Sequence, residues 1–113
     1  MKRFFFANDA ARREYSFLPK MVQDEFGKSL RQVQHGHPPT LPFKHLQGSI
    51  GPGVIELILN SGEAFRCIYI AKFTDRIVVL HSFSKKTNGV DRPAMRLASR
   101  RLKEVEDSMR EMD

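Results

Sequence analysis

The stretch that decides the fold is residues 54–83, which read VIELILNSGEAFRCIYIAKFTDRIVVLHSF. It contains three apolar runs that are rich in β-branched and aromatic residues, a composition typical of strands. The runs are residues 54–59, 64–71 and 77–83. Asn60-Ser61-Gly62 provides a hairpin loop with glycine where positive φ is needed, and Phe73-Thr74-Asp75 provides a second loop. The stretch therefore predicts an antiparallel meander of three strands.

The residues before the meander predict a strand and two helices. The aromatic run at 2–7 favours a strand, and Asn8 and Asp9 can then cap a short helix over 10–15. Residues 18–35 carry apolar side chains three to four apart, which predicts a helix that begins near Pro19 and ends at Gly36. Residues 36–53 are rich in glycine and proline, and we expect a long irregular connection that Phe43 and Leu46 pin to the core.

A final amphipathic helix follows the meander. Asp91 is placed to cap it, and Pro93 suits its first turn. The apolar positions are four and three residues apart: Ala98, Leu102, Val105, Met109 and Met112. Together the predicted elements make one α+β domain over residues 1–113.

The charge of the chain is uneven. The formal net charge is +6. Residues 91–113 hold six basic and six acidic residues, so the whole excess lies in residues 1–90. A basic surface attracts polyanions, which makes RNA, DNA or an acidic protein the expected partner. A soluble domain that is merely basic explains the charge equally well.

The single cysteine and the hydropathy pattern indicate a cytoplasmic protein. Cys67 cannot form an internal disulfide, and its apolar neighbours favour a buried, inert thiol. The apolar run Phe4–Ala7 is too short for the core of a signal peptide, and no stretch approaches the length needed to span a membrane.

Three polar residues interrupt the apolar strands: Glu56, Arg66 and His81. With a three-residue loop at 60–62, Glu56 falls opposite Arg66, where the two could form an ion pair. A second loop of modest length can bring His81 to the same face, and Lys85 and Lys86 then leave the end of the third strand.

This grouping suits metal-independent RNA cleavage, in which the 2′-hydroxyl attacks the adjacent phosphate. The reaction needs a base, an acid and cations aimed at the charge of the phosphorane. Arg66 can clamp two phosphate oxygens, His81 can exchange a proton near neutral pH, and Lys85 and Lys86 can supply charge or a proton. Each residue also has a structural interpretation: a strand arginine paired with Glu56, a half-buried histidine and a solvated lysine turn.

The histidines of the glycine- and proline-rich connection do not predict a metal site. His35, His37 and His45 lack cysteines or carboxylates at ligand spacing. The sequence also contains no glycine-rich phosphate loop and no nucleophile elbow. We therefore expect neither a metal nor another cofactor.

The chain resembles the RelE/ParE toxin superfamily, and more closely its phage-related HigB-like branch. The resemblance rests on the stretches 53–57 (GVIEL), 65–69 (FRCIY) and 79–87 (VLHSFSKKT), and on Ala98 and Arg101 in the final helix. The stretch 79–87 is similar to the branch's "LH-x-F-x-KKT" signature. The resemblance is strongest over residues 53–101.

The resemblance implies N-terminal helices packed on a small twisted antiparallel sheet with a C-terminal helix. It implies ribosome-dependent mRNA cleavage, neutralised by an antitoxin that is commonly a helix-turn-helix protein. It places Arg66 on the scissile phosphate and Lys85 and Lys86 among the catalytic residues, with Tyr69 matching a strand aromatic. We also expect Lys44 and Tyr69, with the two lysines, to contact RNA.

The sequence departs from the family at two points. It has neither the tyrosine nor the histidine that many members carry near the C-terminus, and Ile58 replaces an arginine after Glu56-Leu57. These departures leave two alternatives beside the nuclease: a non-enzymatic inhibitor of DNA gyrase like the ParE-type relatives, or a phage protein that binds nucleic acid without toxicity.

Overall fold

The computed structural model describes residues 1–111, so Met112 of the predicted apolar stripe lies outside the described residues. The elements are β1 (Arg3–Phe6), α1 (Asp9–Ser16), α2 (Lys20–Gln34), β2 (Phe43–His45), β3 (Val54–Ser61), β4 (Glu63–Ile70), β5 (Arg76–Lys85) and α3 (Arg92–Glu111). This order is that of an α+β fold, as predicted, and β1 confirms the strand expected at residues 2–7 before the two N-terminal helices.

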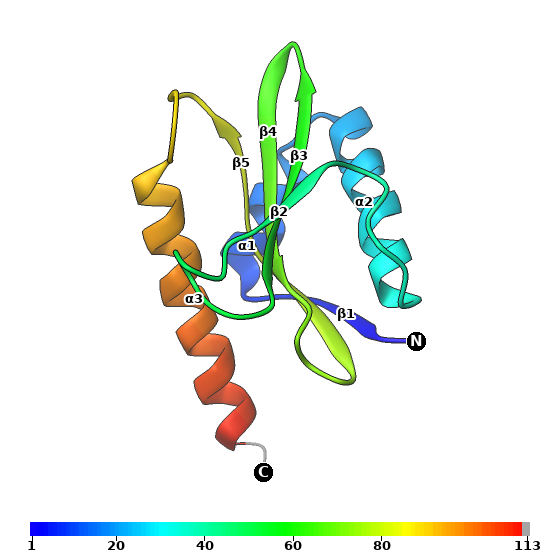
Figure 1. Cartoon of the computed structure of the whole chain (residues 1–113), viewed down its shortest axis with the longest axis vertical. Helices are drawn as coiled ribbons and strands as arrows, with labels where there is room; N and C mark the ends of the chain where they lie inside the picture. The colour runs from blue at the N-terminus through cyan, green and yellow to red at the C-terminus, as the bar shows by residue number, and fades with distance from the viewer. Residues whose placement is uncertain (112–113) are drawn as a thin grey trace.

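The five strands form one sheet in the order β1-β5-β4-β3-β2 (Figure 1). The predicted meander β3-β4-β5 is confirmed as antiparallel. The expectation of a purely antiparallel sheet is wrong, because β1 pairs with β5 in parallel. The sequence analysis also missed β2, a three-residue strand in the long connection that pairs with the edge of β3.

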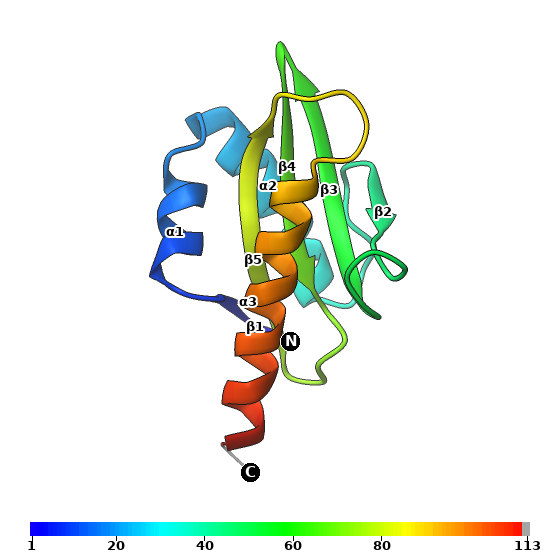
Figure 2. The ribbon, with the colours of Figure 1, turned by 90° about the vertical axis from the view of Figure 1, so that its left-hand side faces the viewer.

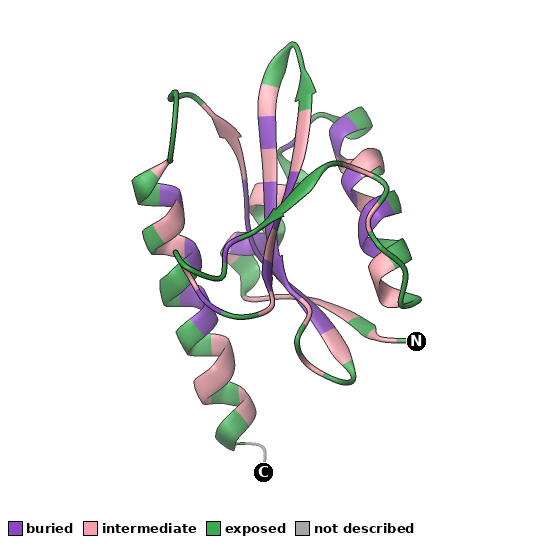
Figure 3. Ribbon diagram, in the orientation of Figure 1, coloured by how far each residue is buried: buried purple, intermediate pink, exposed green. Residues whose placement is uncertain are grey.

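Helices cover both faces of the sheet, so the molecule has two apolar cores (Figures 1 and 2). On one face α2 packs Val22, Phe26 and Leu30 against the sheet. On the other face α3 packs Ala98 and Leu102 against it, and we call this the α3 face. Because both faces are covered, consecutive residues of the central strands are buried, as at 67–70 of β4 and 77–82 of β5, together with the inner sides of the helices (Figure 3).

Side-chain caps explain where the helices α1 and α3 begin. Asn8 accepts a hydrogen bond from Ala11 N at 2.8 Å, and Asp91 accepts one from Ala94 N at 3.1 Å. Both caps were predicted, and each satisfies a backbone N–H that a helix start leaves free.

The long connection is held to the core at two points. Leu46 is buried, as expected, and Ser29 of α2 binds the connection by accepting a hydrogen bond from Leu41 N at 3.0 Å. The same prediction for Phe43 is wrong, because its side chain is 40% exposed on the edge strand β2.

The hairpin between β3 and β4 is tighter than the sequence analysis assumed. Ser61 pairs with Glu63, so Gly62 alone forms the tip, with φ at +76°. The register therefore shifts by two residues, and the expected Glu56–Arg66 pairing is wrong: Glu56 lies opposite Ile68. A shift of two preserves the alternation of faces, so Glu56 and Arg66 still share the α3 face.

A β-bulge in β5 decides which side chains join them. Ile68 pairs with His81, but its neighbour Tyr69 pairs with Val79, so Leu80 is the extra residue. An extra residue reverses the alternation beyond it. As a result Phe83 lies opposite Arg66, and Lys85, two residues further along β5, lies on the same α3 face.

Gly53 is expected to be the glycine most sensitive to substitution. It has φ of +79°, and an added Cβ would lie 2.6 Å from Lys72 Cβ. Gly62 has a similar φ of +76° with nothing within 4 Å. Gly62→Ala should cost about 1–2 kcal/mol from backbone strain alone, and Gly53→Ala should cost more because the clash is added. Urea unfolding of both variants measures these losses, and equal losses would contradict the close packing of Gly53 against Lys72.

Candidate functional site

Arg66 lies at the centre of a polar group on the α3 face. Its direct neighbours across the strands are apolar, Ile58 on β3 and Phe83 on β5. Its diagonal neighbours are polar, and diagonal positions in a sheet are about 7–8 Å apart. They are Glu56, Asn60, His81 and Lys85. Both flanking strands therefore present polar side chains toward one guanidinium.

The guanidinium of Arg66 is held by one nitrogen. Its Nη1 donates to Asn60 Oδ1 at 3.1 Å and to the Phe65 carbonyl at 2.9 Å. Among residues 1–111 no hydrogen bond engages Nη2 or Nε. Those two nitrogens form the edge that matches two oxygens of a phosphate. Arg66 is thus oriented by the hairpin and keeps a bidentate edge available.

A pocket of about 220 Å³ lies beside this group, between the sheet and the start of α3. Its polar lining includes Lys44 of β2, Glu56 of β3 and Lys85 at the end of β5. Glu56 is buried, and its carboxylate pairs with Lys44 at 3.3 Å. No salt bridge or hydrogen bond within the described part of the chain engages Lys85. The pocket therefore contains one neutralised cation and one that is available.

Lys86 does not join Arg66 and Lys85. It is exposed and pairs with Glu63 at 3.0 Å. The same carboxylate accepts a hydrogen bond from Ser84, which faces away from the α3 side. The hydrogen bond from Ser84, followed by that from Lys86, holds the pKa of Glu63 below its usual range. The lysine pair of the sequence thus splits between the two faces.

His81 belongs to a buried network that joins α1, β5 and α3. Its Nδ1 lies 2.8 Å from Glu14 Oε1, and its ring stacks on Phe83 with centroids 4.7 Å apart. Arg101 of α3 donates to both oxygens of Glu14, at 2.7 and 2.9 Å, and to the carbonyl of Leu80 at 2.9 Å. Leu80 is the extra residue of the bulge, so the hydrogen bond from Arg101 stabilises the bulge in β5.

Tyr69 lies on the opposite side of the sheet from Arg66. Its side chain is fully buried in the core formed with α2, and its hydroxyl has no hydrogen-bond partner among the described residues. Burial raises the pKa of this phenol above its ordinary value. In this position Tyr69 is not accessible to RNA, contrary to the RNA contact expected from the sequence.

Cys67 is the buried thiol that its apolar neighbours predict. Burial raises the pKa of this thiol to about 12, so it stays protonated at neutral pH. Cys67 therefore has no part in the chemistry of the site.

The fold and the site define a small basic α+β protein with a cationic sheet face beside a pocket. A family model described as "Phage derived protein Gp49-like (DUF891)" matches residues 13–103. Because the match covers most of the chain, the protein belongs to this phage-derived Gp49-like family, which is in general RelE-like and toxin-like. No curated protein sequence matches the chain significantly. Among residues 1–111, no helix is long and apolar enough to cross a membrane.

Sequence reasoning missed two residues that organise this site. Glu14 belongs to no recognisable sequence motif, and its role is apparent only from the packing of α1 beside β5 and α3. Asn60 was interpreted as part of the loop, but it ends β3 and holds Arg66. The sequence signals for the network were His81, which interrupts an apolar strand, and Arg101, an arginine between apolar positions of the final helix.

The Glu14 network predicts a loss of stability in acid. Burial opposes ionisation of Glu14, but hydrogen bonds from Arg101 and His81 outweigh it, so its pKa lies below the ordinary 4.5. A depressed carboxyl pKa contributes stability above the unfolded value, and this contribution is lost as pH falls through the folded value. We expect Glu14→Gln to lose about 1.5–3 kcal/mol at neutral pH and to depend less on pH below 4.5.

Denaturant unfolding from neutral pH down through this range measures both effects. Glu63→Gln is the matched control, because the pKa of Glu63 is also lowered but the residue is exposed at the surface. It should change stability little. If Glu14→Gln and Glu63→Gln gave the same profile, the network would not stabilise the fold.

Proposed function

We propose that this protein is the toxin of a type II toxin–antitoxin pair and acts as a metal-independent endoribonuclease on ribosome-bound mRNA, like the HigB-like branch that it resembles. One observation carries the proposal: Arg66 and Lys85 share a sheet face beside a pocket, and neither has its charge neutralised by a carboxylate among the described residues. Membership of a toxin-like family and the net charge of +6 support it.

In the proposed reaction the 2′-oxygen of the RNA attacks the adjacent phosphorus and the bond to the 5′ oxygen breaks. The products are a 2′,3′-cyclic phosphate and a 5′-hydroxyl. Negative charge grows on the phosphorane oxygens, where the Nη2–Nε edge of Arg66 would hold two of them. Lys85 would donate the proton that the leaving 5′ oxygen needs. We assign acceptance of the 2′-hydroxyl proton to Glu56, the carboxylate that lines the same pocket.

The other predicted residues take supporting roles in this proposal. His81 does not line the pocket that Glu56 and Lys85 line, and its Nδ1 is engaged by Glu14 while its ring stacks on Phe83, so in this proposal it positions Phe83 and the end of β5 rather than contacting RNA. Lys44, which is half exposed at the pocket mouth, would contact RNA phosphate. The partner that neutralises the toxin would be an antitoxin, commonly a helix-turn-helix protein in related systems. The proposal needs no cofactor and places the reaction in the cytoplasm.

Substitution of the two proposed catalytic cations should abolish cleavage. Arg66→Ala removes the phosphate clamp and should lower cleavage of translated mRNA by about 10²–10³-fold. Lys85→Ala should lower it by about 10²-fold or more, because the general acid is lost. Primer extension on mRNA after induced expression measures the cleavage, and growth arrest should disappear in parallel.

Lys86→Ala is the matched control for Lys85→Ala. Its side chain pairs with Glu63 away from Arg66, so its removal should change cleavage by less than about threefold. Equal losses in Lys85→Ala and Lys86→Ala would refute the assignment. Growth arrest with DNA-damage signalling and intact mRNA would instead favour a gyrase inhibitor, and the absence of any toxicity would favour a plain nucleic-acid-binding protein.

A further inference from the structure

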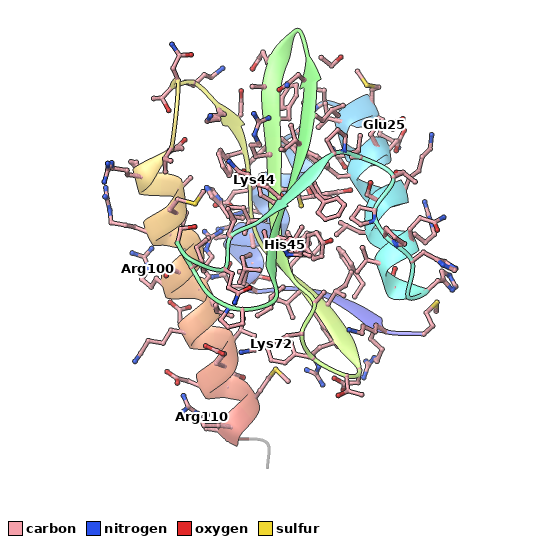
Figure 4. All side chains as sticks on the ribbon, in the orientation of Figure 1. Glu25, Lys44, His45, Lys72, Arg100 and Arg110 are labelled. Atoms are coloured by element: carbon pink, nitrogen blue, oxygen red, sulfur yellow. The ribbon has the colours of Figure 1, made fainter. Side chains whose placement is uncertain are left out.

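The first three turns of α3 carry a row of exposed cations. We call this row, Arg92, Arg96, Arg100 and Lys103, the α3 basic stripe. At 3.6 residues per turn the four side chains lie within an arc of about 80°. Arg100 points away from the sheet on the outer side of α3 (Figure 4). Arg101, in contrast, is buried and bonded to Glu14. The stripe is thus a surface feature, separate from the buried network.

The fold gives no reason for these cations. Residues 92–103 contain no carboxylate, and within residues 1–111 no ion pair or hydrogen bond engages a side chain of the stripe. Arg92 lies in the first turn, where a positive charge opposes the helix dipole. The second half of α3 differs, because Glu106 pairs there with Lys72 at 2.7 Å and Asp107 with Arg110. The stripe is therefore a concentrated positive charge that no internal partner offsets.

The stripe begins at the mouth of the pocket. Asp91 and Met95 line the pocket with Lys85, and they alternate along the chain with the first residues of the stripe. From Arg92 to Lys103 the stripe extends about 16 Å along the helix axis. A strand with its phosphate on Arg66 and Lys85 can therefore continue directly onto α3.

The chemistry of the surface favours nucleic acid over protein. Protein interfaces are centred on exposed apolar or aromatic side chains. None of the large hydrophobic residues that are exposed in the described chain lies on α3: Val90 lies beside the pocket just before the helix, and the others lie on other segments, namely Met1, Phe17, Met21 and Phe43. Interfaces with nucleic acid are polar and strongly positive. Because α3 has no aromatic residue on which a base could stack, the recognised group is the phosphate backbone.

We propose that the α3 basic stripe binds the phosphate backbone of the RNA strand that leaves the pocket, without preference for sequence. The inference rests on the proposed function, since the strand is the same RNA whose phosphate lies on Arg66. It adds a second binding surface, which holds the nucleotides on one side of the scissile bond.

Binding of RNAs of two lengths tests the stripe. The probes are a labelled oligouridylate of about 12 nucleotides and a trinucleotide, both 2′-O-methylated so that the attacking hydroxyl is absent. The triple variant Arg92→Gln, Arg96→Gln, Arg100→Gln should weaken binding of the longer probe about tenfold or more and reduce its salt slope by about 2. Binding of the trinucleotide, which occupies only the pocket, should not change.

A second triple variant controls for net charge. It removes three exposed arginines from α1 and α2 by the substitutions Arg12→Gln, Arg13→Gln and Arg31→Gln. This variant should weaken binding of the longer probe by less than about threefold. Circular dichroism verifies that both variants are folded. If the two triple variants weakened binding of the longer probe equally, net charge alone would explain the binding and the proposed role of the α3 basic stripe would be refuted.

Two further results separate the stripe from the proposed function. Lysine in place of each of the three stripe arginines keeps the charge and should retain binding, whereas loss equal to that of the glutamine variant would overturn the proposal. Cleavage of translated mRNA by the unmodified protein is measured separately. Intact mRNA would refute the nuclease but not the stripe, and unaltered binding by the stripe variant would refute the stripe but not the nuclease.

Discussion

The extra residue at Leu80 is the constraint on which the site depends. Without it, the alternation of β5 would continue from Val79, and Ser82, Ser84 and Lys86 would share the face of Arg66. The bulge instead places Phe83 and Lys85 there, and it turns Lys86 toward Glu63. One inserted residue thus selects which lysine of an adjacent pair accompanies the strand arginine. The selection is a property of the backbone, so it holds before any ligand binds.

The bulge in turn is held by the network of Glu14, His81 and Arg101. A bulge leaves a strand with irregular pairing, and here the carbonyl of Leu80 accepts a hydrogen bond from Arg101. The pairing of β1 with β5 ends at Phe6 and Val79, so the rest of β5 has no neighbouring strand on that side. The helix α1 places Glu14 beside this unpaired part of β5. Two helices from opposite ends of the chain therefore meet over the same segment of β5. In our account this network is structural, and the cations on the α3 face carry the chemistry.

The elements were predictable because their signals are local. The apolar runs of β3, β4 and β5, the spacing in α2 and α3 and the caps Asn8 and Asp91 each depend on residues close in sequence. What failed depends on contacts distant in sequence. The β1–β5 pairing, the strand β2 and the bulge have no local signature, and Tyr69 matched a family motif although it faces the core. Arg66 was expected to be grouped with both Lys85 and Lys86, and only the register reveals that Lys85 alone shares its face.

The most direct test of the central claim is whether Arg66 and Lys85 bind the same phosphate. Nuclear magnetic resonance can follow the side-chain Nε–H of Arg66 and the Nζ of Lys85 while a 2′-O-methylated trinucleotide is added. Our account predicts that both signals shift together and saturate at the same RNA concentration, while the signal of Lys86 stays unchanged. Shifts confined to Lys86 and the α2 side, with Arg66 unaffected, would contradict it.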